Sequence, residues 1–157
     1  MLSYARGPDE PLCELTIGQV LDRAVERWPD RPALVSCHQH QRYTWRELRD
    51  AADKVGRGLA ALGIGHGDRV GIWSSNCAEW VLVHLACARA GAVLVNVNPA
   101  YRSHELAFVL RKSGMKALFL WDSDSRCNYA QMLKEATSGQ ALALEHTIFF
   151  GTDCWER

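Results

Sequence analysis

Residues 68–99 constrain the fold more than any other part of the chain. Their sequence is DRVGIWSSNCAEWVLVHLACARAGAVLVNVNP, an apolar run, a polar loop, a longer apolar segment and a second run rich in valine. This pattern predicts a strand over 69–73, a helix over 78–90 that ends at Gly91, and a strand over 92–97. Strand, helix and strand in this order form a βαβ unit, so the chain is predicted to be an α/β protein.

Residue type predicts further details of this unit. Asn76 is expected to cap the helix, because its side-chain oxygen can accept from the first free backbone N–H groups, and Glu79 is placed to reach back to that cap. Apolar residues surround most of the helix, so we expect it to be covered on several sides. The uninterrupted run over 92–97 is typical of a parallel strand buried on both faces.

More helices and strands are expected on either side of this unit. Thr16 with Gln19, and Thr44 with Glu47, each form a capping box that opens a helix. The additional helices are expected over 17–28, 45–62, 103–113 and 126–136, and the additional strands over 33–37, 42–44, 116–121 and 146–150. Right-handed crossovers then give one mostly parallel sheet with helices on both faces, preceded by a small N-terminal β-hairpin.

Composition argues against several classes of partner. Lysine plus arginine equals aspartate plus glutamate, 18 of each, so no charge excess points to nucleic acid or to an anionic membrane. The most apolar stretch, 81–97, is interrupted by His84, Arg89 and Gly91 before it reaches the length of a membrane-spanning helix. The N-terminus lacks the apolar segment of a signal peptide. We expect a soluble, cytoplasmic protein with no transmembrane segment.

The cysteines suit neither a zinc site nor a disulfide framework. No two of them form a CxxC pair, and they stand at positions 13, 37, 77, 87, 127 and 154. We interpret them as small, buried thiols in a reducing compartment.

Two apparent ligand motifs have simpler structural interpretations. The segment 63–68 (GIGHGD) has closely spaced glycines, but it lies between a helix and a strand, whereas a phosphate loop lies between a strand and a helix. We therefore favour a helix end and a turn. His38 and His40 could both ligate a metal, but with no third ligand nearby in sequence we favour an exposed polar turn.

Other residue types with catalytic potential are also interpreted structurally. His84 and Cys87 share the apolar helix, and we favour a satisfied core histidine beside an inert thiol over a nucleophile pair. The carboxylates of Glu79, Asp122 and Asp124 offer no pair at a spacing that specifies acid–base catalysis.

The ends of the predicted strands are the positional candidates for a binding site. Ligands of α/β proteins bind beyond the carboxyl ends of parallel strands, which indicates Ser74–Asn76 and Asn96–Tyr101. The alternative is that 74–76 caps a helix and that Asn96–Pro99 terminates a strand, and we favour this alternative.

Several short segments, in this order along the chain, resemble motifs of the AMP-forming adenylating enzymes. This superfamily contains acyl-CoA synthetases, luciferases and adenylation domains. Residues 43–48 (YTWREL) resemble the first core motif of that superfamily, 67–70 (GDRV) follow as expected, and 88–99 (ARAGAVLVNVNP) resemble the second core motif. The resemblance covers about 16–150. The segment NPAYR over 98–102 favours the branch of the superfamily that acts on medium- and long-chain fatty acids.

The resemblance implies a ligase that uses ATP and Mg²⁺ to convert a fatty acid to an acyl-adenylate, and then transfers the acyl group to CoA. That chemistry needs a glycine-rich loop of backbone donors, a carboxylate for the ribose and a lysine. In the family these groups follow the part matched here. Thr137-Ser138-Gly139 copies three letters of the family's phosphate loop, but the next residues do not continue it and no lysine occurs after Lys134. The resemblance therefore assigns no catalytic, cofactor-binding or metal-ligating residue, and no bound cofactor, to this chain alone.

We accordingly expect an incomplete N-terminal domain of the adenylate-forming fold. A disordered leader is expected over 1–15, followed over 16–157 by a partial AMP-binding-enzyme domain that stops before the phosphate loop. Such an N-terminal fragment of a fatty acid–CoA ligase, with its C-terminal portion missing, is expected to be inactive alone. Two alternatives remain open: a standalone module that binds a nucleotide or CoA, and an interaction module that completes a partner chain.

Overall fold

A parallel four-stranded sheet forms the centre of the molecule. The structure, a computed structural model, describes residues 5, 7–8, 11–125, 127–152 and 155. The sheet has the order β4-β3-β5-β6, and its strands are β3 (Arg69–Trp73), β4 (Val93–Asn96), β5 (Ala117–Leu120) and β6 (His146–Phe149). Each neighbouring pair is parallel, which confirms the predicted α/β architecture.

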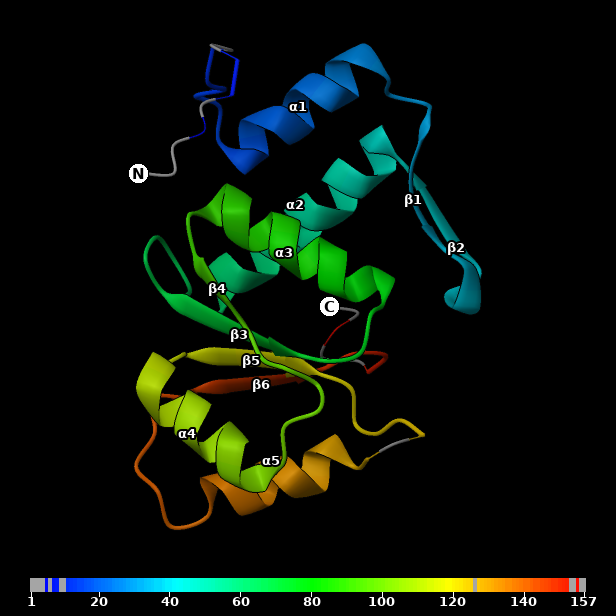
Figure 1. Cartoon of the computed structure of the whole chain (residues 1–157). Helices are drawn as coiled ribbons and strands as arrows, with labels where there is room; N and C mark the ends of the chain where they lie inside the picture. Colours follow the sequence, from blue (N-terminus) through cyan, green and yellow to red (C-terminus); the bar gives the residue numbers. More distant parts are fainter. Residues whose placement is uncertain (1–4, 6, 9–10, 126, 153–154, 156–157) are drawn as a thin grey trace.

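The helices lie on both faces of this sheet (Figure 1). They are α1 (Ile17–Arg27), α2 (Trp45–Ala61), α3 (Ala78–Ala90), α4 (Ser103–Ser113) and α5 (Tyr129–Thr137). One core lies between the sheet and α2 with α3, and a second lies between the sheet and α4 with α5. Helix α1 packs on the outer side of α2 and α3, away from the sheet (Figure 1).

The predicted N-terminal hairpin is present as a separate antiparallel pair, β1 (Pro32–Ser36) with β2 (Gln41–Thr44). The two strands are joined by a short 3₁₀ helix, η1 (Cys37–Gln39), and His40 follows it with φ 55°. The hairpin packs against α2 and α3, and with α1 it encloses a third, smaller apolar cluster.

Local signals in the sequence placed most helix ends correctly. Both predicted capping boxes form: Thr16 Oγ1 accepts from Gln19 N at 3.2 Å, and Thr44 Oγ1 accepts from Glu47 N at 3.3 Å. The Thr44 backbone N–H in turn donates to the Glu47 carboxylate, and this bond lowers the pKa of Glu47. Gly91 ends α3 with φ 72°, as predicted.

Strand β4 differs from its prediction. Within the described residues it pairs only with β3, at one edge of the sheet, and Val93 is 49% exposed. The expectation of burial on both faces is therefore wrong for the described structure, because an apolar run indicates a strand without indicating how many neighbours it has.

Two other expectations need correction or fall partly outside the described residues. Helix α5 begins at Tyr129, where 126 was expected, and residue 126 is not described. The described residues among 5–15 carry no helix or strand, and the remainder of the expected leader is not described. No helix in the described part of the chain is long and apolar enough to cross a membrane.

Candidate functional site

The carboxyl ends of β3 and β5 lie side by side, and the loops that leave them are bonded to each other. Ser75, in the loop after β3, donates from Oγ to Asp124 Oδ2 at 2.9 Å. Tyr129 OH donates to the same oxygen at 2.9 Å, and the Cys127 backbone N–H donates to Asp124 Oδ1 at 3.1 Å. Asp124 thus joins the β3–α3 loop to the β5–α5 loop and to the first residue of α5.

The loop after β4 is also bonded to its neighbour. Trp73, fully buried at the end of β3, donates from Nε1 to the Asn98 carbonyl at 3.1 Å. The Asn98 side chain accepts from the Ala100 backbone N–H at 2.9 Å. This arrangement confirms the interpretation of Asn96–Pro99 as the end of a strand, with Asn98 closing a turn.

The start of α3 is capped by a residue from the hairpin. Cys77 is the N-cap and its side chain makes no capping hydrogen bond. Gln39 Oε1 instead accepts from the Ala78 backbone N–H at 2.8 Å, and Gln39 Nε2 donates to Glu79 Oε2 at 2.7 Å. The predicted cap at Asn76, with Glu79 reaching back to it, is therefore wrong, because a side chain from a distant segment takes that role.

Burial raises the pKa values of two thiols and one tyrosine hydroxyl. Burial raises the pKa of Cys77, raises the pKa of Cys87 to about 12, and also raises the pKa of Tyr129. These groups are therefore protonated at neutral pH and are poor nucleophiles. Cys87 is 1% exposed, so the interpretation of Cys87 as a buried thiol is confirmed.

The predictions for the exposed cysteines and for His84 need correction. Cys13 and Cys37 are exposed, so the expectation that all the cysteines are buried is wrong, and Cys154 lies outside the described residues. His84 is half-buried and stacks on Trp80 with ring centroids 5.5 Å apart, but its buried Nδ1 has no hydrogen-bond partner, so it is not the satisfied core histidine that was expected.

The hairpin histidines lie where they were expected. His38 and His40 are exposed in the turn, and His38 Nδ1 lies 3.4 Å from Ser36 Oγ. Across the described ranges, no three His, Cys, Asp or Glu side chains gather closely enough to hold a metal ion.

The remaining sequence signals also have structural roles. Gly63 and Gly67 adopt φ 75° and 81° in the turn that follows α2, which confirms the helix end and turn predicted there. Thr137, in the segment that copies three letters of the phosphate loop, is the last residue of α5 and donates from Oγ1 to the Leu133 carbonyl at 2.9 Å. That segment leaves a helix, whereas a phosphate loop leads into one.

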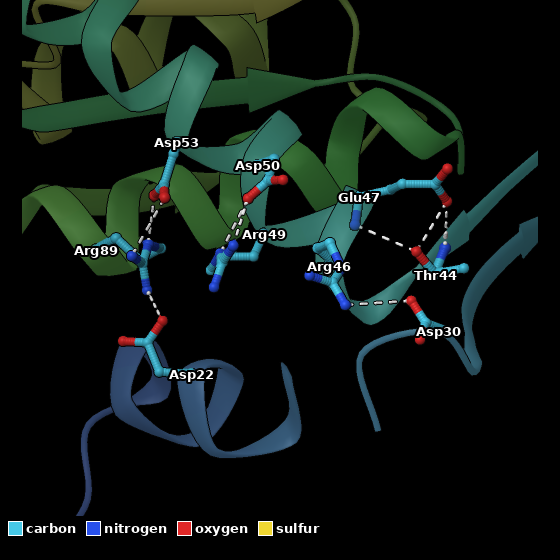
Figure 2. A network of polar contacts seen from close by, with 9 residues as sticks. All are labelled: Asp22, Asp30, Thr44, Arg46, Glu47, Arg49, Asp50, Asp53 and Arg89. Atoms are coloured by element: carbon cyan, nitrogen blue, oxygen red, sulfur yellow. Dashed lines mark hydrogen bonds and ion pairs between the residues drawn. The ribbon is translucent and has the colours of Figure 1, made fainter. Parts of the chain in front are cut away.

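On the side of the sheet that carries α1, ion pairs hold three helices together (Figure 2). Arg89, on α3, donates from Nη1 to Asp22 of α1 at 2.8 Å and from Nε to Asp53 of α2 at 2.6 Å. Because Arg89 is only 23% exposed, these bonds are partly shielded from water, unlike the exposed Arg46–Asp30 pair in the same view.

An open groove of about 1050 Å³ lies over the β5–β6 part of the sheet. Helix α2 and strand β2 form its walls with the start of α3, and Trp155 lies at its edge. Most of its lining is apolar, including Val55, Leu82, Phe119 and Ile148. The buried carboxylate of Glu79 also lines it.

Together these contacts hold the loops at the ends of the strands by hydrogen bonds. Of the strand-end side chains that could meet a ligand, Ser75 and Asp124 are bonded to each other across two loops, and Asn98 is bonded to Ala100 within its own loop. Sequence reasoning missed both Asp124 and Gln39 as organising residues, since their partners stand 49 and 39 positions away. Nothing in the local sequence marks such partners.

The amino-acid sequence of this chain is similar to those of known enzymes. Residues 21–154 match the family described as AMP-binding enzyme. The chain is 43% identical over 135 residues to the medium-chain acyl-CoA ligase ACSF2, mitochondrial, of Mus musculus, and the match covers 85% of this chain but 22% of that protein.

Solved structures share the fold. The Mycobacterium tuberculosis fatty acyl CoA synthetase matches with a TM-score of 0.76 and 27% identity, covering 85% of this chain and 26% of that one. The inhibitor-bound N-terminal domain of FACL13 from the same organism matches with a TM-score of 0.78 and 26% identity, covering 90% of this chain and 34% of that one.

Proposed function

Because this chain belongs to the AMP-binding enzyme family, we propose that it supplies the N-terminal part of an ATP-dependent, AMP-forming fatty acid–CoA ligase. The observation that carries the proposal is the 43% identity over 135 residues to a medium-chain acyl-CoA ligase. The chain spans about a fifth of that relative's length, so the activity of the whole protein is part of the proposal.

The reaction that we propose for the whole ligase has two steps. The fatty acid carboxylate attacks the α-phosphorus of ATP, in the presence of Mg²⁺, and releases pyrophosphate. The CoA thiolate then attacks the acyl carbon of the acyl-adenylate and releases AMP. Fatty acid, ATP and CoA are thus the proposed small-molecule partners, and a role in fatty acid metabolism follows.

Within this scheme the described residues serve as scaffold. A helix N-terminus binds a phosphate through its free backbone N–H groups. At α3 the Ala78 N–H is already bonded to Gln39, and the Glu79 carboxylate beside it would repel a phosphate. The start of α3 therefore does not fit ATP, and we assign no catalytic, nucleotide-binding or metal-ligating role to the described residues.

We also propose a domain division and a compartment. Residues 16–157 are proposed to form part of one N-terminal domain, with 1–15 as a leader outside it. The cytoplasm is the proposed compartment, although the mouse relative is named as mitochondrial. Fractionation of cells that express the tagged chain tests this, because recovery with the mitochondrial matrix would contradict it.

The experiment that tests the proposed function is complementation by fusion. The chain is joined to the part of the mouse ligase that follows the matched region, and fatty acid-dependent exchange of pyrophosphate into ATP is measured. We expect exchange and acyl-CoA formation from the fusion. A folded fusion that binds ATP but shows neither reaction would contradict the proposal, whereas saturable ATP or CoA binding by the unfused chain would favour a standalone binding module.

A further inference from the structure

The loops that leave β3 and β5 turn toward opposite faces of the sheet. In the order β4-β3-β5-β6, the crossover from β3 leads to β4 on one side and the crossover from β5 leads to β6 on the other. Helix α3 shares a face of the sheet with α2, whereas α5 lies with α4 on the opposite face (Figure 1). The carboxyl ends of β3 and β5 therefore form a topological switch point, the place at which open α/β sheets bind their ligands.

Asp124 bridges this switch point, because its carboxylate accepts hydrogen bonds from both sides of it. Ser75 Oγ, in the loop after β3, and Tyr129 OH, at the start of α5, each donate to Oδ2 at 2.9 Å. The Cys127 backbone N–H donates to Oδ1 at 3.1 Å, and the Cys127 thiol donates to the same oxygen at 3.8 Å. A carboxylate accepts about four hydrogen bonds, so the chain's own groups occupy the oxygens of Asp124.

Two buried aromatic residues extend this bridge to a third loop. Tyr129 is 1% exposed and meets Trp73 edge to face, with ring centroids 4.7 Å apart. Trp73, the last residue of β3, is fully buried and donates from Nε1 to the Asn98 carbonyl in the loop after β4. Because both rings are packed in the core, the loops after β3, β4 and β5 are held in one arrangement.

The chemistry at the switch point favours an uncharged part of a substrate. The carboxylate of Asp124 would repel a phosphate that approaches it. Ser75 directs its O–H at Asp124, so its oxygen offers lone pairs, and no donor, to a ligand. The adenosine of ATP, the fatty acyl chain and the pantetheine arm of CoA are compatible with such an edge, whereas a phosphate is not.

We propose that Asp124 is a positioning residue of the ligase, which fixes the loops after β3, β4 and β5 where an uncharged part of a substrate binds. Asp124 acts through these loops, since its own oxygens are occupied by donors of the chain. This inference rests on the proposed function, because the substrates are those of the proposed ligase.

Two substitutions remove the carboxylate in different ways. Asp124→Asn keeps the size of the side chain but replaces one accepting oxygen with an NH₂ group. Asp124→Ala leaves a space on which the donors from Ser75, Tyr129 and Cys127 still converge, so that free acetate can take the place of the carboxylate. The matched control is Asp30→Ala, because Asp30 is an exposed carboxylate that pairs with the exposed Arg46.

The bridge itself is tested in the chain alone by thermal unfolding. Asp124→Ala should lower the Tm, and acetate should restore about half of that loss, while chloride at the same ionic strength restores little. Acetate and chloride should affect Asp30→Ala equally. The same Tm for Asp124→Ala and Asp30→Ala, or equal effects of acetate and chloride on Asp124→Ala, would overturn the proposal.

The positioning role is tested in the fusion of this chain with the rest of the mouse ligase. We expect Asp124→Asn to raise the KM for ATP, decanoate or CoA by about fivefold or more, with kcat within about twofold of the parent fusion. A merely structural role would lower the fraction of folded enzyme, which reduces kcat and leaves each KM unchanged. Asp30→Ala should change none of the three KM values. Unchanged KM values for all three substrates in Asp124→Asn would overturn the proposal, whatever the effect on kcat.

The parent fusion separates this inference from the proposed function. Pyrophosphate exchange by the parent, with unchanged KM values in Asp124→Asn, refutes only the positioning role. If the parent shows no exchange, the proposed function fails, and the Kd values of ATP and CoA measured by calorimetry replace KM in the same comparison. A folded parent that binds neither ATP nor CoA refutes both claims.

Discussion

Gln39 Oε1 accepts a hydrogen bond from the backbone N–H of Ala78 at 2.8 Å, although the two residues are 39 positions apart. The same Gln39 side chain accepts from Ser36 Oγ at 2.6 Å and donates to Glu79, which ties the hairpin to the start of α3. Helix α3 covers the central strands, so this bond connects the hairpin to the sheet core through one amide.

We predict that Gln39→Ala destabilises the chain more than loss of an exposed glutamine does. The substitution leaves the Ala78 N–H and the Glu79 carboxylate without their partner, at a cost of about 1–3 kcal/mol in the free energy of unfolding. The matched control is Gln131→Ala, because Gln131 is exposed and its side chain donates to Glu135 on the same helix. Urea denaturation at low protein concentration measures both, and equal midpoints for the two variants would contradict the role of Gln39.

Arg89→Leu should separate α1 from α2 and α3. It removes bonds to Asp22 and Asp53 that are partly shielded from water, and we expect a loss of about 1–3 kcal/mol. Arg46→Leu is the control within the same network (Figure 2), since its exposed pair with Asp30 contributes at most about 1 kcal/mol. Limited proteolysis between α1 and β1 should accelerate in the Arg89 variant alone, and similar cleavage of both variants would show that α1 is held by other contacts.

Gly71→Ala should be destabilising despite its small size. A Cβ at Gly71, in the middle of β3, would overlap Met115 Sδ and lie 2.9 Å from Leu118 Cδ1, and both of those side chains are fully buried. Overpacking of this kind costs about 1–3 kcal/mol. At Gly65 a Cβ meets nothing within 4 Å, so Gly65→Ala should leave the Tm nearly unchanged. A Tm for Gly71→Ala that matches the control would mean that the core rearranges without cost.

Cys87 should make the chain less stable in alkaline solution. Burial raises its pKa from 9.0 to about 12, so between these values the unfolded chain releases a proton that the native chain keeps. The free energy of unfolding therefore falls as pH rises through this window, by up to ~1.4 kcal/mol per pH unit from this thiol. Cys87→Ala should flatten the slope measured between about pH 9 and pH 10.5. An unchanged slope would assign the alkaline loss to other groups, such as Tyr129.

Signals that act within four residues of the chain were sufficient to predict much of this fold. The capping boxes at Thr16 and Thr44, and the helix end at Gly91, depend on neighbours in sequence, and all three were predicted correctly. The alternation of strands and helices then led to a parallel sheet, because a crossover helix between two strands permits few other arrangements.

The features that the sequence did not predict depend on contacts between distant segments. Asn76 is of a residue type that commonly caps helices. The backbone N–H of Ala78 is bonded instead to Gln39, which lies on a hairpin whose position is set by tertiary packing. Asp124 was considered only as one of three carboxylates without a spacing for acid–base catalysis, yet it joins two strand-end loops through Ser75. The apolar run of β4 did not reveal that the strand lies at a sheet edge, because burial depends on neighbours and not on the run itself.

The central claim is that residues 1–157 supply scaffold and not the catalytic groups of a fatty acid–CoA ligase. Loss of a single transition-state donor typically costs ~10²–10³ in rate, and a chain without the glycine-rich loop, the ribose carboxylate and the lysine lacks several such groups at once. The most direct test measures fatty acid-dependent exchange of pyrophosphate into ATP by the chain alone, purified from a host that lacks its own fatty acyl-CoA ligases. We predict exchange no faster than in buffer, and fatty acid-dependent exchange that rises in proportion to the concentration of this chain would contradict the claim.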